Sequence, residues 1–170
     1  AGSTLDQFYD FGGAGAGRTI TADAGAVTIA GNDGLVITGT AGSGAVAPSG
    51  AGTRMVWNPN KAAIRAGGVT STQWDDSSIG YFSTAMGAST TASGDRSTAL
   101  GANTLATGLT STALGNNSTA SGFNSTSMGV GTTASNTAAT AMGTTSIASG
   151  TSSTAMGYFT TASGNNATAM

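Results

Sequence analysis

Glycine and apolar residues recur every fourteen positions from Ile79 onward. The first glycine series is Gly87, Gly101, Gly115, Gly129, Gly143 and Gly157. An apolar residue stands directly before each of these glycines, and the next expected position carries another: Met86, Leu100, Leu114, Met128, Met142, Met156 and Met170. The segment therefore repeats one structural unit, and period and phase can be followed to the last residue.

A second glycine series lies between the members of the first. It is Gly80, Gly94, Gly108, Gly122, Gly150 and Gly164, with Asn136 in the remaining place. Because Asn replaces Gly best where φ is positive, this exception predicts left-handed backbone at the second series.

Alanine keeps a shorter period of seven, from Ala85 to Ala169, with Ser127 as a substitution. A coiled coil would need two bulky apolar positions per heptad and good helix formers elsewhere. Here each heptad instead contains a glycine, which costs a helix about 1 kcal/mol relative to alanine, and many Thr and Ser residues. Short Thr-rich segments between Gly and Asn turns indicate a β-solenoid with two strands in each fourteen-residue coil.

Side-chain alternation along a strand assigns each position to a side. Thr and Met or Leu should point outward, with Ser, Ala and Gly inward, so that alanine fills a narrow interior. The position after alanine is apolar on one wall and polar on the other, where it is occupied by Ser93, Thr107, Ser121, Ser135, Ser149 and Ser163. One interpretation puts the Met and Leu residues in the solenoid's own core. The simpler one covers this apolar row by self-association of parallel chains, most plausibly three.

The chain before about residue 76 has a different composition. It holds six of the seven acidic residues, four of the five basic ones and both tryptophans, which predicts two modules, 1–76 and 77–170. Short strands are expected between glycine turns, and they could pair between chains as a trimeric β shaft. The expected strands are 18–22, 26–29, 35–38, 54–57 and 62–65, the last two around the turn 58–61.

Composition excludes most catalytic chemistry. The 170 residues include no His and no Cys, and 7% are charged, with a net charge of −2. We therefore expect no enzyme, no cofactor and no metal site, no nucleic-acid partner and no membrane insertion by this segment. Asp75 and Asp76 could ligate calcium, although a junction turn explains them better. Asp95 with Arg96 would form a solvated or inter-chain ion pair.

Five aromatic residues occupy the two positions after repeat glycines, where turns let side chains project. They are Tyr81, Phe82, Phe123, Tyr158 and Phe159. They are candidate surface contacts for a host-surface glycan or matrix protein. Their alternative role is to cover the gap between neighbouring chains.

The units Ser97–Gly101, Ser111–Gly115 and Asn124–Gly129 resemble YadA-type head repeats, and the resemblance covers about 77–170. Thr98 and Thr126 stand where that family often has Val. The resemblance implies a left-handed parallel β-roll that is obligately trimeric, as in heads of trimeric autotransporter adhesins and in tail fibres of phages and injection systems. Residues 9–20 and 74–80 more loosely resemble bacterial tail-fibre-like proteins.

These observations predict an extracellular homotrimeric fibre that projects and attaches, on a cell surface or on a virion or injection particle. Met170 falls in mid-repeat, so a longer parent chain is expected. A structural spacer without a ligand is one alternative. Ice binding is another, because Thr91 with Ser93, Thr119 with Ser121 and Thr161 with Ser163 form a hydroxyl ladder, which Leu105 and Ile147 interrupt.

Overall fold

The computed structural model describes residues 35–44 and 49–170. Every strand of the described residues lies in one compact unit, Thr38–Met170. The strands expected at 18–22 and 26–29 lie outside the described residues. Leu35–Thr38 forms no strand, contrary to the prediction, and its residues are exposed.

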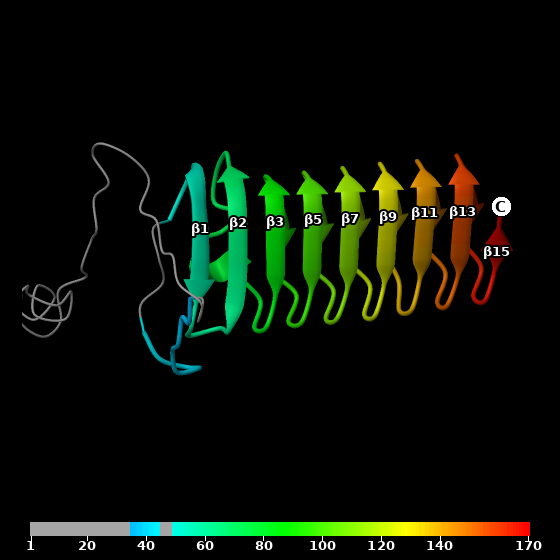
Figure 1. The fold of residues 1–170 in the computed structure, drawn as a ribbon. Helices are drawn as coiled ribbons and strands as arrows, with labels where there is room; N and C mark the ends of the chain where they lie inside the picture. The colour runs from blue at the N-terminus through cyan, green and yellow to red at the C-terminus, as the bar shows by residue number, and fades with distance from the viewer. Residues whose placement is uncertain (1–34, 45–48) are drawn as a thin grey trace, which may run out of the picture. The chain divides into compact units, whose positions relative to one another are not determined.

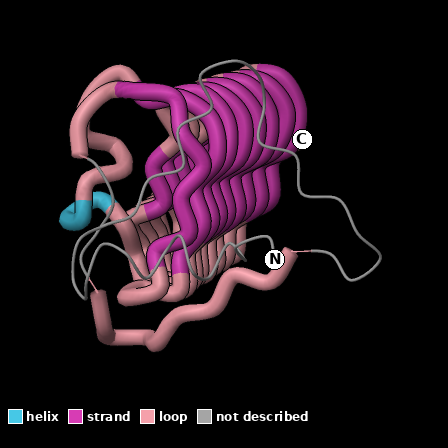
Figure 2. The backbone as a smooth tube through the Cα atoms, turned by 60° about the vertical axis from the view of Figure 1, so that its left-hand side comes forward, coloured by secondary structure: helices cyan, strands magenta, loops and turns pink. Residues whose placement is uncertain are grey.

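The repeat region is the predicted β-solenoid, with two strands in each coil (Figure 1). One strand of each coil joins a nine-stranded sheet through β3 (Thr84–Ala88), β5 (Thr98–Ala102), β7 (Thr112–Asn116), β9 (Thr126–Val130), β11 (Thr140–Thr144), β13 (Thr154–Tyr158) and β15 (Thr168–Ala169). The other joins a six-stranded sheet through β4 (Thr91–Ala92), β6 (Leu105–Ala106), β8 (Thr119–Ala120), β10 (Thr133–Ala134), β12 (Ile147–Ala148) and β14 (Thr161–Ala162). All neighbouring strands within the repeats are parallel, and the coils stack in one direction (Figure 2).

Strand register confirms the fourteen-residue period. Leu100 lies opposite Leu114, and Ala99 lies opposite Ala113, so each residue stacks on its equivalent one coil away. The alanines of the seven-residue series from Ala85 to Ala155 are fully buried and pack as a narrow core between the two walls. Serines such as Ser97 and Ser111 are also buried, whereas Met and Leu are on the outer side of the same strands. The predicted sides of Thr, Ser, Ala and Met or Leu are confirmed.

The prediction about glycine backbone is wrong for the second series. Gly94 and its equivalents have φ outside the left-handed region, and glycine is needed because a Cβ at Gly94 would lie 2.1 Å from the carbonyl oxygen of Gly108. Positive φ occurs in the first series instead, for example 121° at Gly101. The missing Cβ of Gly101 is directed at the Gly115 carbonyl of the next coil, not into the core. Asn136 is accommodated, and its Nδ2 donates to the carbonyl oxygen of Ser149 at 3.1 Å.

Two further positions of each coil are left-handed and are mostly not glycine. In the turn before each long strand they are Phe82, Arg96, Thr110, Asn124, Ala138, Ser152 and Asn166. In the turn after each long strand they are Ser89, Asn103, Asn117, Gly131, Thr145 and Phe159. Asn is the non-glycine residue that accepts this backbone best, so the recurrence of Asn at these positions is the sequence feature that indicates left-handed backbone there.

A β-hairpin precedes the first coil. Strands β1 (Gly52–Asn58) and β2 (Ala63–Val69) pair antiparallel around the turn 58–61, which confirms both expected strands and the turn. β2 then pairs in parallel with β3, so the hairpin belongs to the nine-stranded sheet. A short 3₁₀ turn, η1 (Asp76–Ser78), follows and leads into the repeats. The division of the chain near residue 76 stays a prediction.

Candidate interaction surfaces

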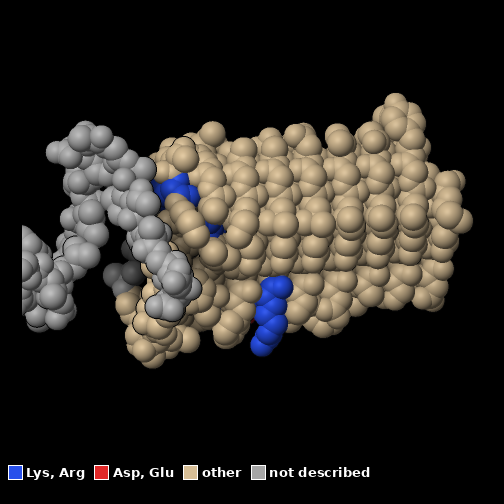
Figure 3. All heavy atoms as spheres, viewed as in Figure 1, with Lys and Arg blue, Asp and Glu red and all other residues tan. Residues whose placement is uncertain are grey.

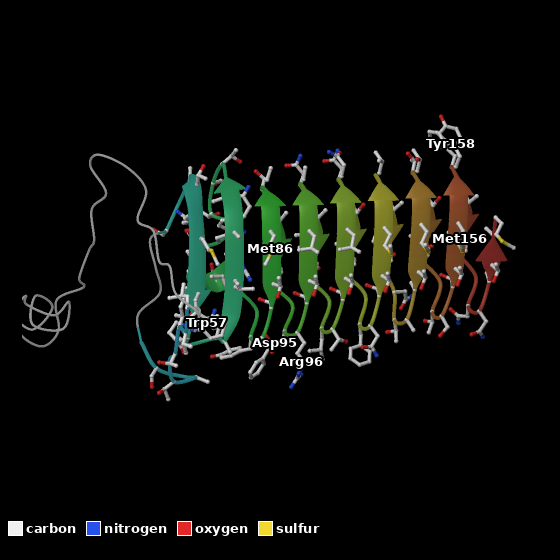
Figure 4. The ribbon with its side chains drawn as sticks, in the orientation of Figure 1. Trp57, Met86, Asp95, Arg96, Met156 and Tyr158 are labelled. Atoms are coloured by element: carbon white, nitrogen blue, oxygen red, sulfur yellow. The ribbon has the colours of Figure 1, made fainter. Side chains whose placement is uncertain are left out.

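The outer face of the nine-stranded sheet carries a continuous apolar row. We call Met86, Leu100, Leu114, Met128, Met142 and Met156 the Met/Leu stripe, in which each residue lies directly opposite the next. Met86 and Met156 are each 39% exposed and project from the same face of the sheet (Figure 4). The interpretation that these residues fill the solenoid's own core is therefore wrong, because the alanines already fill it. Met170, beyond β15, is exposed.

The opposite wall carries hydroxyl side chains. Thr107, Ser121, Ser135 and Ser163 are exposed, and Thr119 lies opposite Thr133 in the strand pairing. Leu105 and Ile147 are exposed in the same row as Thr91, Thr119 and Thr161 and interrupt it as expected. The solenoid thus presents one apolar and one hydroxyl-rich outer wall.

The candidate aromatic residues are all exposed, but they lie at two different edges. Tyr81, Phe82 and Phe123 lie in turns before the long strands, whereas Tyr158 and Phe159 lie at the end of β13 and in the turn after it. The Tyr158 and Phe159 rings meet edge to face at 4.5 Å between centroids. Whether they contact a ligand or a neighbouring chain stays a prediction.

Asp75 and Asp76 serve a junction between the hairpin and the first coil. The Asp75 carboxylate accepts a hydrogen bond from the backbone N–H of Gly50 at 2.6 Å, and Asp76 pairs with Lys61 at 3.0 Å. The Lys61 ammonium also donates to the carbonyl oxygen of Ile79 at 2.9 Å. In the described part of the chain no cluster of three or more acidic side chains gathers that could hold a metal ion.

Asp95 and Arg96 project from the turn edge (Figure 4). Asp95 accepts a hydrogen bond from the backbone N–H of Tyr81 at 2.9 Å, which ties one coil to the next. The Arg96 guanidinium lies 5.9 Å from the centroid of the Phe82 ring. Apart from Arg96, the basic residues visible in Figure 3 lie at the hairpin end, so the repeat surface is almost free of positive charge.

Arg65, which no sequence pattern singled out, is buried at the hairpin end of the core. Its guanidinium donates to the carbonyl oxygens of Ile64, Ser83 and Ala92 and to Oγ of Ser83, at 2.8–3.0 Å. Desolvation by burial lowers the pKa of Arg65 to about 10, so the side chain remains charged at neutral pH. Arg65 stands between Ile64 and Ala66 in the expected strand, and neither composition nor residue spacing predicts that its side chain is buried.

Comparison with protein families identifies the repeats. The model described as YadA head domain repeat (2 copies) matches residues 78–104, 106–122, 120–146 and 148–170, more than half of the chain. The chain therefore belongs to the YadA head repeat family, which confirms the resemblance and the β-solenoid. This family consists of surface-exposed, adhesin-like repeats that are typically not enzymes. A comparison with curated proteins finds no match. In the described ranges no helix has the length and hydrophobicity of a bilayer-crossing segment.

Proposed function

We propose that the chain forms a homotrimeric extracellular fibre with the Met/Leu stripe of each copy at the common axis. The observation that carries this proposal is the contrast between the two outer walls of one solenoid. Six apolar side chains stack in register on one wall, whereas Ser and Thr occupy the equivalent positions of the other.

Leaving this stripe in water costs free energy, because apolar surface is more stable when it is removed from water. Parallel strands stack about 4.8 Å apart, so the stripe is an unbroken apolar surface along the solenoid. Fully burying an exposed Met or Leu side chain is worth about 1.5–3 kcal/mol. The stripe side chains are already partly buried in one copy, with 39% of Met86 and of Met156 still exposed, so association gains a fraction of this value at each of the six positions. A closed ring of identical copies covers the stripe of every copy at once. Membership of the YadA head repeat family supports three copies.

The fibre's role is to project and attach. The hydroxyl wall would face outward in a trimer and offers many small hydrogen-bonding groups with little charge. Contacts of this kind are weak singly, but repetition along the coils and across three copies raises the overall affinity through effective concentration. The looser likeness of residues 74–80 to tail-fibre-like proteins favours a fibre of a phage or injection particle over a cell-surface adhesin.

Assembly is tested with matched variants in the same two coils. Leu100→Asp with Leu114→Asp would bury repeated like charges and should abolish the trimer in sedimentation equilibrium. Thr107→Asp with Ser121→Asp adds the same charge to the hydroxyl wall and should leave the trimer intact. A stable monomer of the unsubstituted chain would refute the proposal.

Attachment is tested with trimeric protein on glycan arrays and cell surfaces. Phe123→Ala and Tyr158→Ala should weaken binding while leaving trimer stability unchanged if these rings contact a ligand. Unchanged binding with a less stable trimer would make the rings inter-chain contacts. A trimer that binds no surface would support the alternative of a structural spacer without a ligand. Thermal hysteresis comparable to that of antifreeze proteins would support the alternative of ice binding.

A further inference from the structure

The apolar row does not end where the repeats begin. In the nine-stranded sheet Met86 lies opposite Ala66, and Ala66 lies opposite Met55. The register thus continues the Met/Leu stripe across both strands of the hairpin. Met55 is 74% exposed, more than any residue of the stripe itself.

A second apolar pair lies beside this extension. Trp57 lies opposite Ile64, and Ile64 lies opposite Thr84 of the first coil. Trp57 is 39% exposed and is drawn near the start of the sheet in Figure 4. The alternation of β1 therefore places Met55 and Trp57 together on the outer face, the face that carries the stripe.

The two faces of β2 have different surroundings. Arg65 points inward and closes the end of the alanine core, while Ile64 and Ala66 on either side of it point outward. Closing the core requires only the inward residue. If the hairpin only covered the end of the alanine core, its outer face would contact water. Polar residues would be stable there, and a large apolar side chain such as Trp57 would have no function.

We propose that the outer face of this hairpin is the N-terminal end of the trimer interface, where Met55, Trp57 and Ile64 of each copy contact the same residues of the other two. The inference rests on the proposed trimer. It extends the interface beyond residues 78–170, the part that matches the family model. Parallel copies around one axis bring equivalent hairpins to the same height, so a second copy of this chain is the partner that continuity with the stripe requires.

The hairpin then couples two events. Trimer formation would hold β2 in place from outside, and the same strand carries Arg65 into the core end from inside. Loss of the outer contact should therefore loosen the capped end of each solenoid as well as the assembly.

Trp57 provides a test that needs no substitution. Trp74 is only 2% exposed, so quenching of tryptophan fluorescence by acrylamide in the folded chain reports on Trp57. We expect Trp57 to be protected in the full chain at concentrations where sedimentation shows a trimer, and to become quenchable when the trimer is dissociated by dilution.

Variants of Met55 give the second measurement. Met55→Asp should raise the concentration for half-dissociation at least about tenfold, whereas Met55→Leu and Ser71→Asp, a charge control in an exposed loop, should leave it nearly unchanged. A trimer in which Trp57 is fully quenched and Met55→Asp has no effect would overturn this inference and leave the proposed function standing. A monomeric chain would overturn both. If Met55→Asp fails to fold, acrylamide quenching of Trp57 in the unsubstituted trimer decides whether the hairpin is part of the interface.

Discussion

Arg65 occupies in the hairpin the position that Ala85 occupies in the first coil. The two residues lie directly opposite each other where β2 pairs with β3, and both are fully buried. The alanine core of the solenoid therefore ends against a guanidinium group. Its donors reach the carbonyl oxygens of Ser83 and Ala92, which belong to the first coil.

Substitution of Arg65 separates packing from charge. Arg65→Ala leaves a cavity and should lower the free energy of unfolding by about 2–4 kcal/mol. Arg65→Met fills the volume without burying a charge and should remain within about 1 kcal/mol of the original protein. The acceptors at Ser83 and Ala92 also keep backbone donors, from Ile64 and Gly80. Urea unfolding at one protein concentration measures the difference, and equal losses for Ala and Met would show that the hydrogen bonds dominate.

Glycine suits Gly108 and Gly131 for different reasons, and only Gly108 excludes a Cβ by contact. A Cβ at Gly108 would lie 2.0 Å from the carbonyl oxygen of Gly122, so Gly108→Ala should destabilise the protein by more than about 1 kcal/mol. Gly131 has a φ of 64° and an added Cβ would come no closer than 3.6 Å to Thr145. Gly131→Asn should therefore stay within about 1 kcal/mol of the original. Thermal unfolding of the two variants checks this, and a tolerated Gly108→Ala would contradict the stacking argument.

The narrow core predicts a large loss of stability at Ala113 and little change at the equivalent Ser127. Ala113→Val adds volume between closely packed walls and should cost about 1–3 kcal/mol. Ser127→Ala restores the residue found at the other positions and should change the stability by less than about 1 kcal/mol. Thr132, which shares a hydrogen bond with Ser127 at 2.8 Å, keeps Ser118 as a partner at 3.0 Å. In urea, the free energy of unfolding of Ala113→Val should be clearly lower than that of the original protein and that of Ser127→Ala.

Thr145 is a β-branched residue with a φ of 53°. This backbone is costly for a branched side chain, and the equivalent positions Asn103 and Asn117 carry the residue that accepts it best. Thr145→Asn should raise the free energy of unfolding by about 1 kcal/mol. A lowered melting temperature for this variant would indicate that the Thr145 side chain makes a contact worth more than the strain.

The sequence by itself determined the coil. Identical residues recur every fourteen positions, and stacking each residue on its equivalent satisfies the backbone and gives every coil the same surroundings. Period, register, the alanine interior and the outward Met/Leu stripe all follow from this local pattern. Side-chain alternation is a property of any strand, so the sides could be assigned before any contact was known.

Only the tertiary structure decided the features that depend on residues distant along the chain. A glycine can be needed because its φ is positive or because a neighbouring coil comes too close for a Cβ. The sequence shows glycine at both Gly94 and Gly101 and does not tell which of these causes applies at each position. The parallel pairing of β2 with β3 is likewise a long-range contact. That pairing placed Arg65 at the end of the core and aligned Met55 with the stripe, because register across separate strands is fixed by their packing and not by local preference.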